Sequence, residues 1–428
     1  MFNQEAIHCS PRVEVSRRQL LRATSLATIG WMTPVAQLLA RQSEINSRQP
    51  ARSVIVLWLA GGPSQLETFD PHPGANIAAG TKAIATAAPG MQLAAGFERL
   101  AEQAQSLALV RSLVSPEADH ERGTYVGQTG FAPDPTVVHP AIGAICCHEL
   151  PVEAVEIPRH VSILAGQWPS RGGYLGAEYD AFKTPDPREP IPDLRAAVSD
   201  ERLQRRLTDL DTVDRSFLQG RGAQLAGSPD RELTARARAM MSSEQLRAFR
   251  VEEEPAAVHE RYGDTPFGRG CLAARRLVDV GVRCVEITLG GWDSHVDNHA
   301  IHKRLVATLD PALAALIAEL RERGTLDHTV IVCAGEFGRT PKVNPLGGRD
   351  HWPHGFSALL AGGRIRGGAI VGETDPEGIQ KVTQPRQYAD LHATVLTALG
   401  IDPRKELMTP IGRPLKLSEG KVIKELLG

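Results

Sequence analysis

The chain is 428 residues long, too long for one minimal domain but ordinary for a large α/β domain with insertions. Hydrophobic residues make up 42% and charged residues 23% of the sequence, a globular composition with ample material for a core. The net charge of −2 gives no reason to expect nucleic acid or an anionic membrane surface as a partner. Aromatic residues, at 5%, do not indicate a stacking platform for bases or sugars, so a binding site here is expected to be polar.

The first 40 residues predict an export signal. Residues 16–21 read Ser-Arg-Arg-Gln-Leu-Leu, which resembles the twin-arginine consensus, and a mildly apolar stretch follows from Ala23 to Ala40. That stretch is too polar and too interrupted for a stable membrane span, and an ordinary amphipathic first helix is the alternative. Residues 41–52 are interpreted as a linker. We therefore expect the chain to engage the twin-arginine translocase and to work in the periplasm or as a secreted protein.

Short apolar runs alternate with helical patterns over residues 53–415. Such runs are typical of strands covered on both faces, and helices are indicated at 267–281 and by a leucine repeat that ends before Gly324. We predict an α/β fold, a doubly wound and mostly parallel sheet with helices on both faces. The predicted strands are Ser53–Ala60, Ser106–Val110, His160–Ala165, Val282–Leu289, Thr329–Ala334 and Phe356–Ala361.

Two segments fall outside this alternation. Residues 195–262 are rich in Arg, Glu, Asp and Gln and predict a charged helical insertion, and residues 416–428 are interpreted as a C-terminal tail. The cysteines that follow the signal show no zinc-like spacing. We expect mostly buried thiols at Cys146, Cys147, Cys271, Cys284 and Cys333.

Polar clusters follow several predicted strands, where ligands gather in open α/β sheets. In the segment 61–70, Glu67 and Asp70 are suited to a cation, although a glycine turn before a capped helix explains them equally well. In the segment 119–124, His120 lies near Arg122, a pair suited to anion binding and acid–base chemistry. A capping aspartate followed by an exposed histidine is the alternative.

The segment 290–299 has the strongest spacing. Asp293 and His295 point the same way if the strand conformation persists, whereas His295 and His299 share a face if a helix begins there. Either arrangement suits a cation with carboxylate and imidazole ligands, and a polar loop is the alternative.

A fourth cluster begins directly after the predicted strand 329–334. Glu336 and Arg339 are followed by Asp350 and His351, a set suited to an anion held against a metal. A structural salt bridge between Glu336 and an arginine is the competing interpretation.

Together these clusters resemble a bacterial family called domain of unknown function 1501, DUF1501. The resemblance covers about residues 50–415, and members of the family commonly carry twin-arginine signals. The family is regarded as a relative of the alkaline phosphatase and sulfatase superfamily, which implies an alkaline-phosphatase-like fold and metal-dependent hydrolysis. The matching motifs are Leu-Trp-Leu-Ala-Gly-Gly-Pro-Ser (57–64), Gly-Gly-Trp-Asp-Ser-His (290–295), Gly-Glu-Phe-Gly-Arg-Thr-Pro (335–341) and Gly-Arg-Asp-His-Trp (348–352).

The wider resemblance assigns positions to single residues. His120 is similar in position to the sulfatase nucleophile, Glu336 to a superfamily aspartate, and His351 to a later metal-binding histidine. The chain also departs from the superfamily pattern. Residues 61 and 62 are glycines where sulfatases have paired aspartates, Phe337 replaces a histidine, and the formylglycine-forming cysteine is absent.

The sequence and the resemblance therefore predict an exported metal-dependent hydrolase of phosphate or sulfate esters, acting on an anionic ester carried by a small molecule or a polymer. His120 is expected to act as nucleophile or general acid, and Arg339 or Arg122 to clamp the anion. One alternative is a non-catalytic relative that serves as an exported binding or assembly protein, and another is a cofactor-bearing partner in a larger complex. The divalent cation, zinc, manganese, calcium or iron, is expected on Asp293, His295, Glu336, Asp350 and His351.

Overall fold

The computed structural model describes residues 51–428 except 152–154, 193, 195, 219–228, 376 and 378–381. The predicted twin-arginine signal at residues 1–40, and the predicted linker up to residue 50, lie outside the described residues. The described part belongs to one unit of the chain, Pro50–Gly428.

A nine-stranded sheet runs through this unit in the order β12-β4-β11-β8-β1-β7-β5-β6, with β13 also paired to β4. Strand β11 is antiparallel to both of its neighbours, and every other described pair in the sheet is parallel. The prediction of a mostly parallel sheet is confirmed. The strands are β1 (Ser53–Ala60), β4 (Leu107–Val114), β5 (His160–Ile163), β6 (Phe182–Thr184), β7 (Cys284–Gly290), β8 (Thr329–Ala334), β11 (Phe356–Gly362), β12 (Ile370–Val371) and β13 (Arg386–Gln387).

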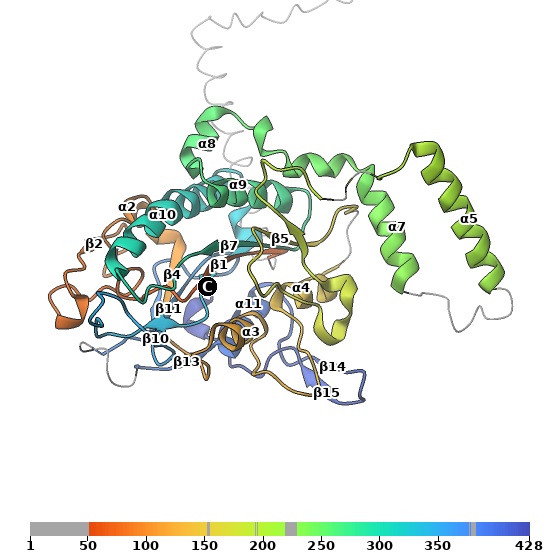
Figure 1. The fold of residues 1–428 in the computed structure, drawn as a ribbon. Coiled ribbons are helices and arrows are strands. Elements are labelled where there is room, and N and C mark those ends of the chain that lie inside the picture. The colour runs from red at the N-terminus through yellow and green to blue at the C-terminus, as the bar shows by residue number, and fades with distance from the viewer. Residues whose placement is uncertain are drawn as a thin grey trace, which may run out of the picture. The chain divides into compact units, whose positions relative to one another are not determined.

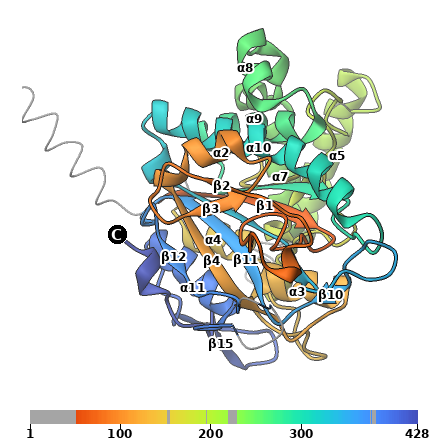
Figure 2. The same cartoon turned by 90° about the vertical axis from the view of Figure 1, so that its left-hand side faces the viewer.

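Helices cover both faces of the sheet, as predicted (Figure 1 and Figure 2). On one face lie α2 (Glu98–Glu102), α8 (Ala256–Tyr262), α9 (Pro266–Asp279) and α10 (Asn298–Glu322), and on the other α3 (His120–Thr129), α4 (Ile142–Glu149) and α11 (Tyr388–Ala398). Strand β1 contributes to the core on both faces of the sheet because its successive side chains point to opposite faces. Ile55, Leu57 and Leu59 pack in the core on the α9 and α10 side, whereas Val54 and Val56 pack in the core on the α4 and α11 side.

Helix α3 approaches the sheet closely because it carries glycine where it crosses β1. A Cβ added at Gly127 would lie 2.4 Å from the ring of Trp58, so any side chain there collides with the indole. The helix begins at His120, where the side chain of the capping Asp119 accepts a hydrogen bond from the backbone N–H of Arg122. The close approach brings the first turn of α3 next to the ends of β1 and β8.

The charged insertion predicted at 195–262 is helical where the structure describes it. It contains α5 (Asp200–Leu218), α7 (Pro229–Met241), the 3₁₀ turns η5 (Glu244–Phe249) and η6 (Val251–Glu253), and α8. The remaining 3₁₀ turns are η1 (Asn76–Ala78), η2 (Ala104–Ser106), η3 (Gly173–Leu175), η4 (Ala177–Tyr179), η7 (Leu326–His328) and η8 (Lys424–Leu426).

The predicted C-terminal tail differs from the structure. Residues 416–428 pack onto the α11 side of the sheet, where Ile423 and Leu426 are completely buried. Its first residue, Lys416, ends β15 (Pro414–Lys416), which pairs with β14 (Glu406–Met408) in a small hairpin. Two further hairpins join β2 (Ala83–Ala85) to β3 (Gln92–Ala94) and β9 (Gly338–Arg339) to β10 (His351–Trp352).

The cysteines behave as predicted. Cys146, Cys147, Cys271, Cys284 and Cys333 are buried free thiols, and burial raises the pKa of each of them. Among the helices of the described residues, none is both long and apolar enough to cross a membrane.

Candidate functional site

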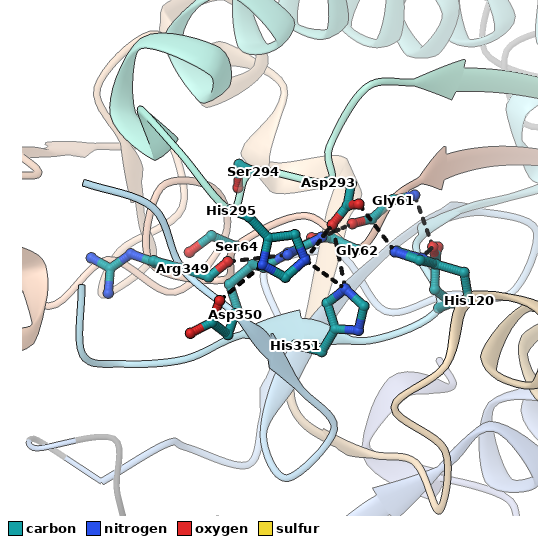
Figure 3. A network of polar contacts seen from close by, with 12 residues as sticks. Gly61, Gly62, Ser64, His120, Asp293, Ser294, His295, Arg349, Asp350 and His351 are labelled. Atoms are coloured by element: carbon teal, nitrogen blue, oxygen red, sulfur yellow. Dashed lines mark hydrogen bonds and ion pairs between the residues drawn. The ribbon is translucent and has the colours of Figure 1, made fainter. Parts of the chain in front are cut away.

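Loops from the ends of three neighbouring strands meet at one edge of the sheet (Figure 3). Gly61 follows β1, Asp293 and His295 follow β7, and Glu336 follows β8. His120 joins them from the start of α3, and His351 from β10. Parallel strands carry their carboxyl ends to the same edge, which is why segments so distant in sequence converge here.

Glycine at position 61 is required by this convergence. Its φ of +113° is favourable only for glycine, and a Cβ there would lie 2.5 Å from the backbone nitrogen of Asp293. The N–H of Gly61 donates to Glu336 Oε1 at 2.8 Å. Glycine at this position thus lets the loops after β1, β7 and β8 touch.

Two histidines point their Nε2 atoms at each other. His295 Nδ1 lies 2.8 Å from Asp350 Oδ1 and His351 Nδ1 lies 2.7 Å from the carbonyl oxygen of Ala118. Because both partners are acceptors, the hydrogen of each neutral ring resides on Nδ1, and each Nε2 carries a lone pair. The two Nε2 atoms are 3.1 Å apart.

A carboxylate completes this convergence of electron pairs. Asp293 Oδ1 lies 3.1 Å from His295 Nε2 and 3.3 Å from His351 Nε2. Asp293 Oδ1 already accepts from the guanidinium of Arg339, but the two Nε2 lone pairs face each other and repel unless a positive charge lies between them. The donor set of two imidazoles and a carboxylate, with each ring oriented by a second acceptor, fits a divalent transition metal.

His120 occupies the opposite side of Asp293. Its Nδ1 lies 2.7 Å from Glu336 Oε1, and its Nε2 lies 3.4 Å from Asp293 Oδ2. Buried atoms without a hydrogen-bond partner among the described residues include both His120 Nε2 and Glu336 Oε2. These unsatisfied atoms are a second observation that fits a bound cation or substrate at this edge.

Charge within the cluster sets its protonation. The hydrogen bond to Glu336 raises the pKa of His120, although burial opposes it. Burial tends to raise the pKa of Asp293, but the hydrogen bond and charge of Arg339 outweigh burial and lower it. Burial lowers the pKa of His351, and the hydrogen bond from His295 lowers the pKa of Asp350. Asp293 and Asp350 are therefore anionic at neutral pH.

Arg339 supports the loops from inside. Its side chain is completely buried, and it donates to the carbonyl oxygens of Gly61, Gly62 (2.8 Å) and Arg349 (3.1 Å) and to Asp293 Oδ1 (2.6 Å). The geometry makes Arg339 a positioning residue for Asp293 instead of the expected anion clamp, because its donors are committed to protein acceptors.

Arg122 is not brought into the cluster. It is more than half exposed and forms a bidentate pair with Glu117, with nitrogen–oxygen distances of 2.6 and 2.7 Å. As the third residue of α3, it projects away from the face that carries His120. The expectation that Arg122 clamps an anion receives no support from this geometry.

The first predicted cluster does not form a cation site. Glu67 accepts from the fully buried guanidinium of Arg349 at 2.9 Å, and Asp70 lies 3.3 Å from Arg111 Nε. His299 is 3.3 Å from Glu67, away from His295, because α10 begins only at Asn298. Strand β7 ends at Gly290 and α10 begins at Asn298, so neither the strand nor the helix continues through Asp293 and His295, but these two side chains do face each other, with Asp293 Oδ1 3.1 Å from His295 Nε2.

One group was missed from the sequence, and a second, Phe337, was identified there only as a replacement for a histidine. The carbonyl of Ala118, which orients His351, carries no side-chain signal. Phe337, which cannot bind a metal, lies in the core with its ring centroid 5.0 Å from that of His120 and 4.5 Å from that of His351. Its position directly after Glu336 was the available signal, and it forms the apolar floor of the cluster.

The model of a protein family, described as "Protein of unknown function (DUF1501)", matches residues 51–427. The chain belongs to the DUF1501 family. No curated protein matches it.

Solved structures with similar folds include three hydrolytic or synthetic enzymes. The PsFucS1 sulfatase from Pseudoalteromonas sp. is 13% identical with a TM-score of 0.40, over 86% of this chain and 70% of that one. The phosphonate monoester hydrolase SpPMH from Silicibacter pomeroyi is 14% identical with a TM-score of 0.40, over 89% and 76%. The lipoteichoic acid synthase LtaP from Listeria monocytogenes is 10% identical with a TM-score of 0.36, over 85% and 78%.

Proposed function

We propose that this DUF1501 protein is a metal-dependent hydrolase of phosphate or sulfate monoesters that works outside the cytoplasm. The observation that carries the proposal is the convergence of His295 Nε2, His351 Nε2 and Asp293 Oδ1 within 3.3 Å of one another. A cation bound there would polarise the ester and stabilise negative charge developing on its oxygens. The imidazole-rich donor set favours zinc, iron or manganese over calcium, which prefers oxygen ligands.

The protein side chains divide the remaining work. Asp293, His295 and His351 hold the cation, and Asp350 fixes the tautomer of His295. Glu336 receives one assignment that differs from the sequence expectation: it orients His120 through Oε1 instead of serving primarily as a metal ligand.

His120 is assigned to the leaving group. Of the three histidines described in the cluster, His120 also lines the adjacent pocket, which is bounded by Gly61, Asp293 and Glu336. Its ring therefore lies between the cation ligands and the space where an alcohol would depart. With Nδ1 bonded to Glu336, a proton on His120 Nε2 can be transferred to the ester oxygen.

Export rests on the sequence alone. Arg17 and Arg18 lie in the segment that resembles a twin-arginine signal. A protein exported by that route is folded before transport, which is compatible with a site that must be assembled from several distant loops.

The test is the metal content of the natively exported protein, purified without a metal-affinity tag and measured by plasma mass spectrometry. We expect close to one equivalent of a transition metal, lost in His295→Ala, together with turnover of a phosphate or sulfate monoester. His299→Ala is the matched control, because His299 lies four residues away and contacts Glu67 instead of the cluster. Absence of metal that cannot be restored by soaking would overturn the proposal.

One observation favours the binding-only alternative. Neither Arg122 nor Arg339 has a geometry that would hold the non-bridging oxygens of an ester. A protein that retains one metal equivalent but hydrolyses no phosphate or sulfate monoester would be an exported binding protein.

A further inference from the structure

A pocket of about 560 Å³ opens beside the cluster, and one of the proposed cation ligands, Asp293, forms part of its lining. It lies between α3 and the carboxyl ends of β1, β5 and β7. His120, Thr124 and Gln128 line it from α3, since residues four apart share one helix face. Its size is that of a small-molecule site, and His120, Asp293 and Glu336 connect it to the proposed reaction.

The wall opposite α3 comes from the ends of β5 and β7. Thr288 and Glu286 lie on the same face of β7, two residues apart, and Leu164 follows β5 with a φ of +55°. A leucine in the left-handed region costs free energy that the fold offsets elsewhere, and such residues concentrate at binding sites. The wall is closed by Trp168, whose carbonyl oxygen accepts from Gln128 Nε2 at 2.9 Å.

The charges in this wall are already paired. Glu286 Oε1 lies 3.1 Å from His160 Nε2, and His160 Nδ1 lies 2.9 Å from the carbonyl oxygen of Tyr179. The pair is buried. Burial tends to lower the pKa of His160, but the hydrogen bond and charge of Glu286 outweigh burial and raise it, and a protonated His160 beside the Glu286 carboxylate gives a pair without net charge. Glu336 is paired in the same way with His120.

No lysine or arginine is found among the described residues that line the pocket. An anionic group placed there would lose its water without gaining a partner, which is costly in a partly enclosed site. A ligand with an uncharged ring would instead contact two indoles. It would also contact polar but uncharged side chains. These lining residues are Trp58, Trp168, Thr124, Gln128 and Thr288.

We propose that this pocket receives the alcohol part of the ester, that it accepts an uncharged ring-sized alcohol, and that it rejects one carrying a second negative charge. This inference rests on the proposed hydrolase function, which places the phosphate or sulfate group at the cation and so directs the alcohol part into the pocket. The charge preference itself is a property of the pocket and can be measured without turnover.

The experiment compares phenyl phosphate with carboxyphenyl phosphate, and the corresponding sulfates, by calorimetric titration of the metal-loaded full-length protein. We expect the uncharged alcohol to bind about tenfold or more tightly than its carboxylated partner, since one unpaired charge in such a site costs at least that factor. Equal affinities, a preference for the carboxylated ester, or no binding of either would overturn the inference.

A second experiment introduces a positive charge into the wall of the pocket. Thr288→Lys is expected to remove or invert the preference, whereas Thr288→Met, of similar length without charge, is expected to keep it. If Thr288→Lys does not fold, Gln128→Lys with Gln128→Met as its control replaces it from the α3 side. An unchanged preference in a folded lysine variant would contradict the assignment.

Hydrolysis of the same esters is followed separately. If the protein binds the uncharged ester more tightly but cleaves no ester, the inference about the pocket stands and the proposed function is overturned. If it cleaves both esters at equal kcat/KM, the proposed function stands and the inference about the pocket is overturned.

Discussion

The role of each histidine that faces the proposed cation is set by its other ring nitrogen, Nδ1, which points away from the site. In the neutral tautomers, His295 and His351 present Nε2 lone pairs to the site because Asp350 and the Ala118 carbonyl accept from their Nδ1 atoms. The sequence indicates the residue types, and the resemblance marks His351 as a ligand. Neither says which ring nitrogen is free, because one orienting partner is a backbone carbonyl and the other is 55 residues from its histidine.

Substituting His120 by Asn separates proton donation from metal binding. The Asn amide can still donate toward Glu336, but it offers no group at the position of Nε2. We expect His120→Asn to retain the metal and to lose about 100-fold or more in kcat, most severely for esters with poor leaving groups. Rates with a series of aryl esters of increasing phenol pKa, together with metal analysis, measure both effects.

His351→Asn is the matched control for that substitution. Its amide can replace Nδ1–H as donor to the Ala118 carbonyl, but the variant lacks the proposed ligand atom, so it is expected to lose the metal. If His120→Asn lost the metal to the same degree, His120 would be a ligand and the proton transfer would need another donor.

At the scale of elements, the apolar runs predicted the central strands well. β1 and β8 have the predicted bounds, because each continuous apolar run ends at glycine. The predicted strand 106–110 ended four residues too early, since Arg111 interrupts the pattern. Its guanidinium donates to the carbonyls of Phe69 and Gln92, which allows the strand to continue through a charged residue.

The contact between α3 and β1 lies beyond what periodicity predicts, and it can be tested at Gly127. Gly127→Ala places a methyl group 2.4 Å from the Trp58 ring, so α3 must move or the indole must rotate. We expect a loss of about 1–3 kcal/mol in the free energy of unfolding and, because His120 is carried on the same helix, reduced activity. Urea denaturation measures the first effect.

Gly290→Ala serves as the comparison, because a Cβ there meets no atom within 4 Å. Its free energy of unfolding is expected to stay close to that of the parent protein. A similar loss in both variants would mean that general glycine effects, and not the α3 contact, set the stability.

For the whole molecule, the strand order was the part that sequence could not supply. β1 lies between β7 and β8, which begin more than 200 residues later, so the site depends on pairings that no local pattern encodes. The buried polar residues that hold these distant segments together also make the fold sensitive to acid. Ser64 N–H donates to His302 Nε2 at 2.8 Å, which joins the loop after β1 to α10.

His302 and His392 therefore set a prediction for the stability of the whole chain. Burial lowers the pKa of each to about 4, from an ordinary value of 6.5, so the folded protein holds both rings neutral. Between pH 6.5 and about pH 4 the unfolded chain binds protons that the folded chain does not, so stability falls as pH falls through this window. Each ring contributes about 3 kcal/mol to that loss, from 1.36 kcal/mol for each unit of pKa difference.

Denaturant titrations from pH 7 to pH 4 measure the slope of the free energy of unfolding against pH. This slope is expected to decrease in His392→Gln, where the backbone carbonyl of Gly127 is the hydrogen-bond partner of Nε2 in the parent protein. A slope that is the same in His392→Gln and the parent protein would mean that His392 is protonated in the folded state, and that acid sensitivity arises elsewhere.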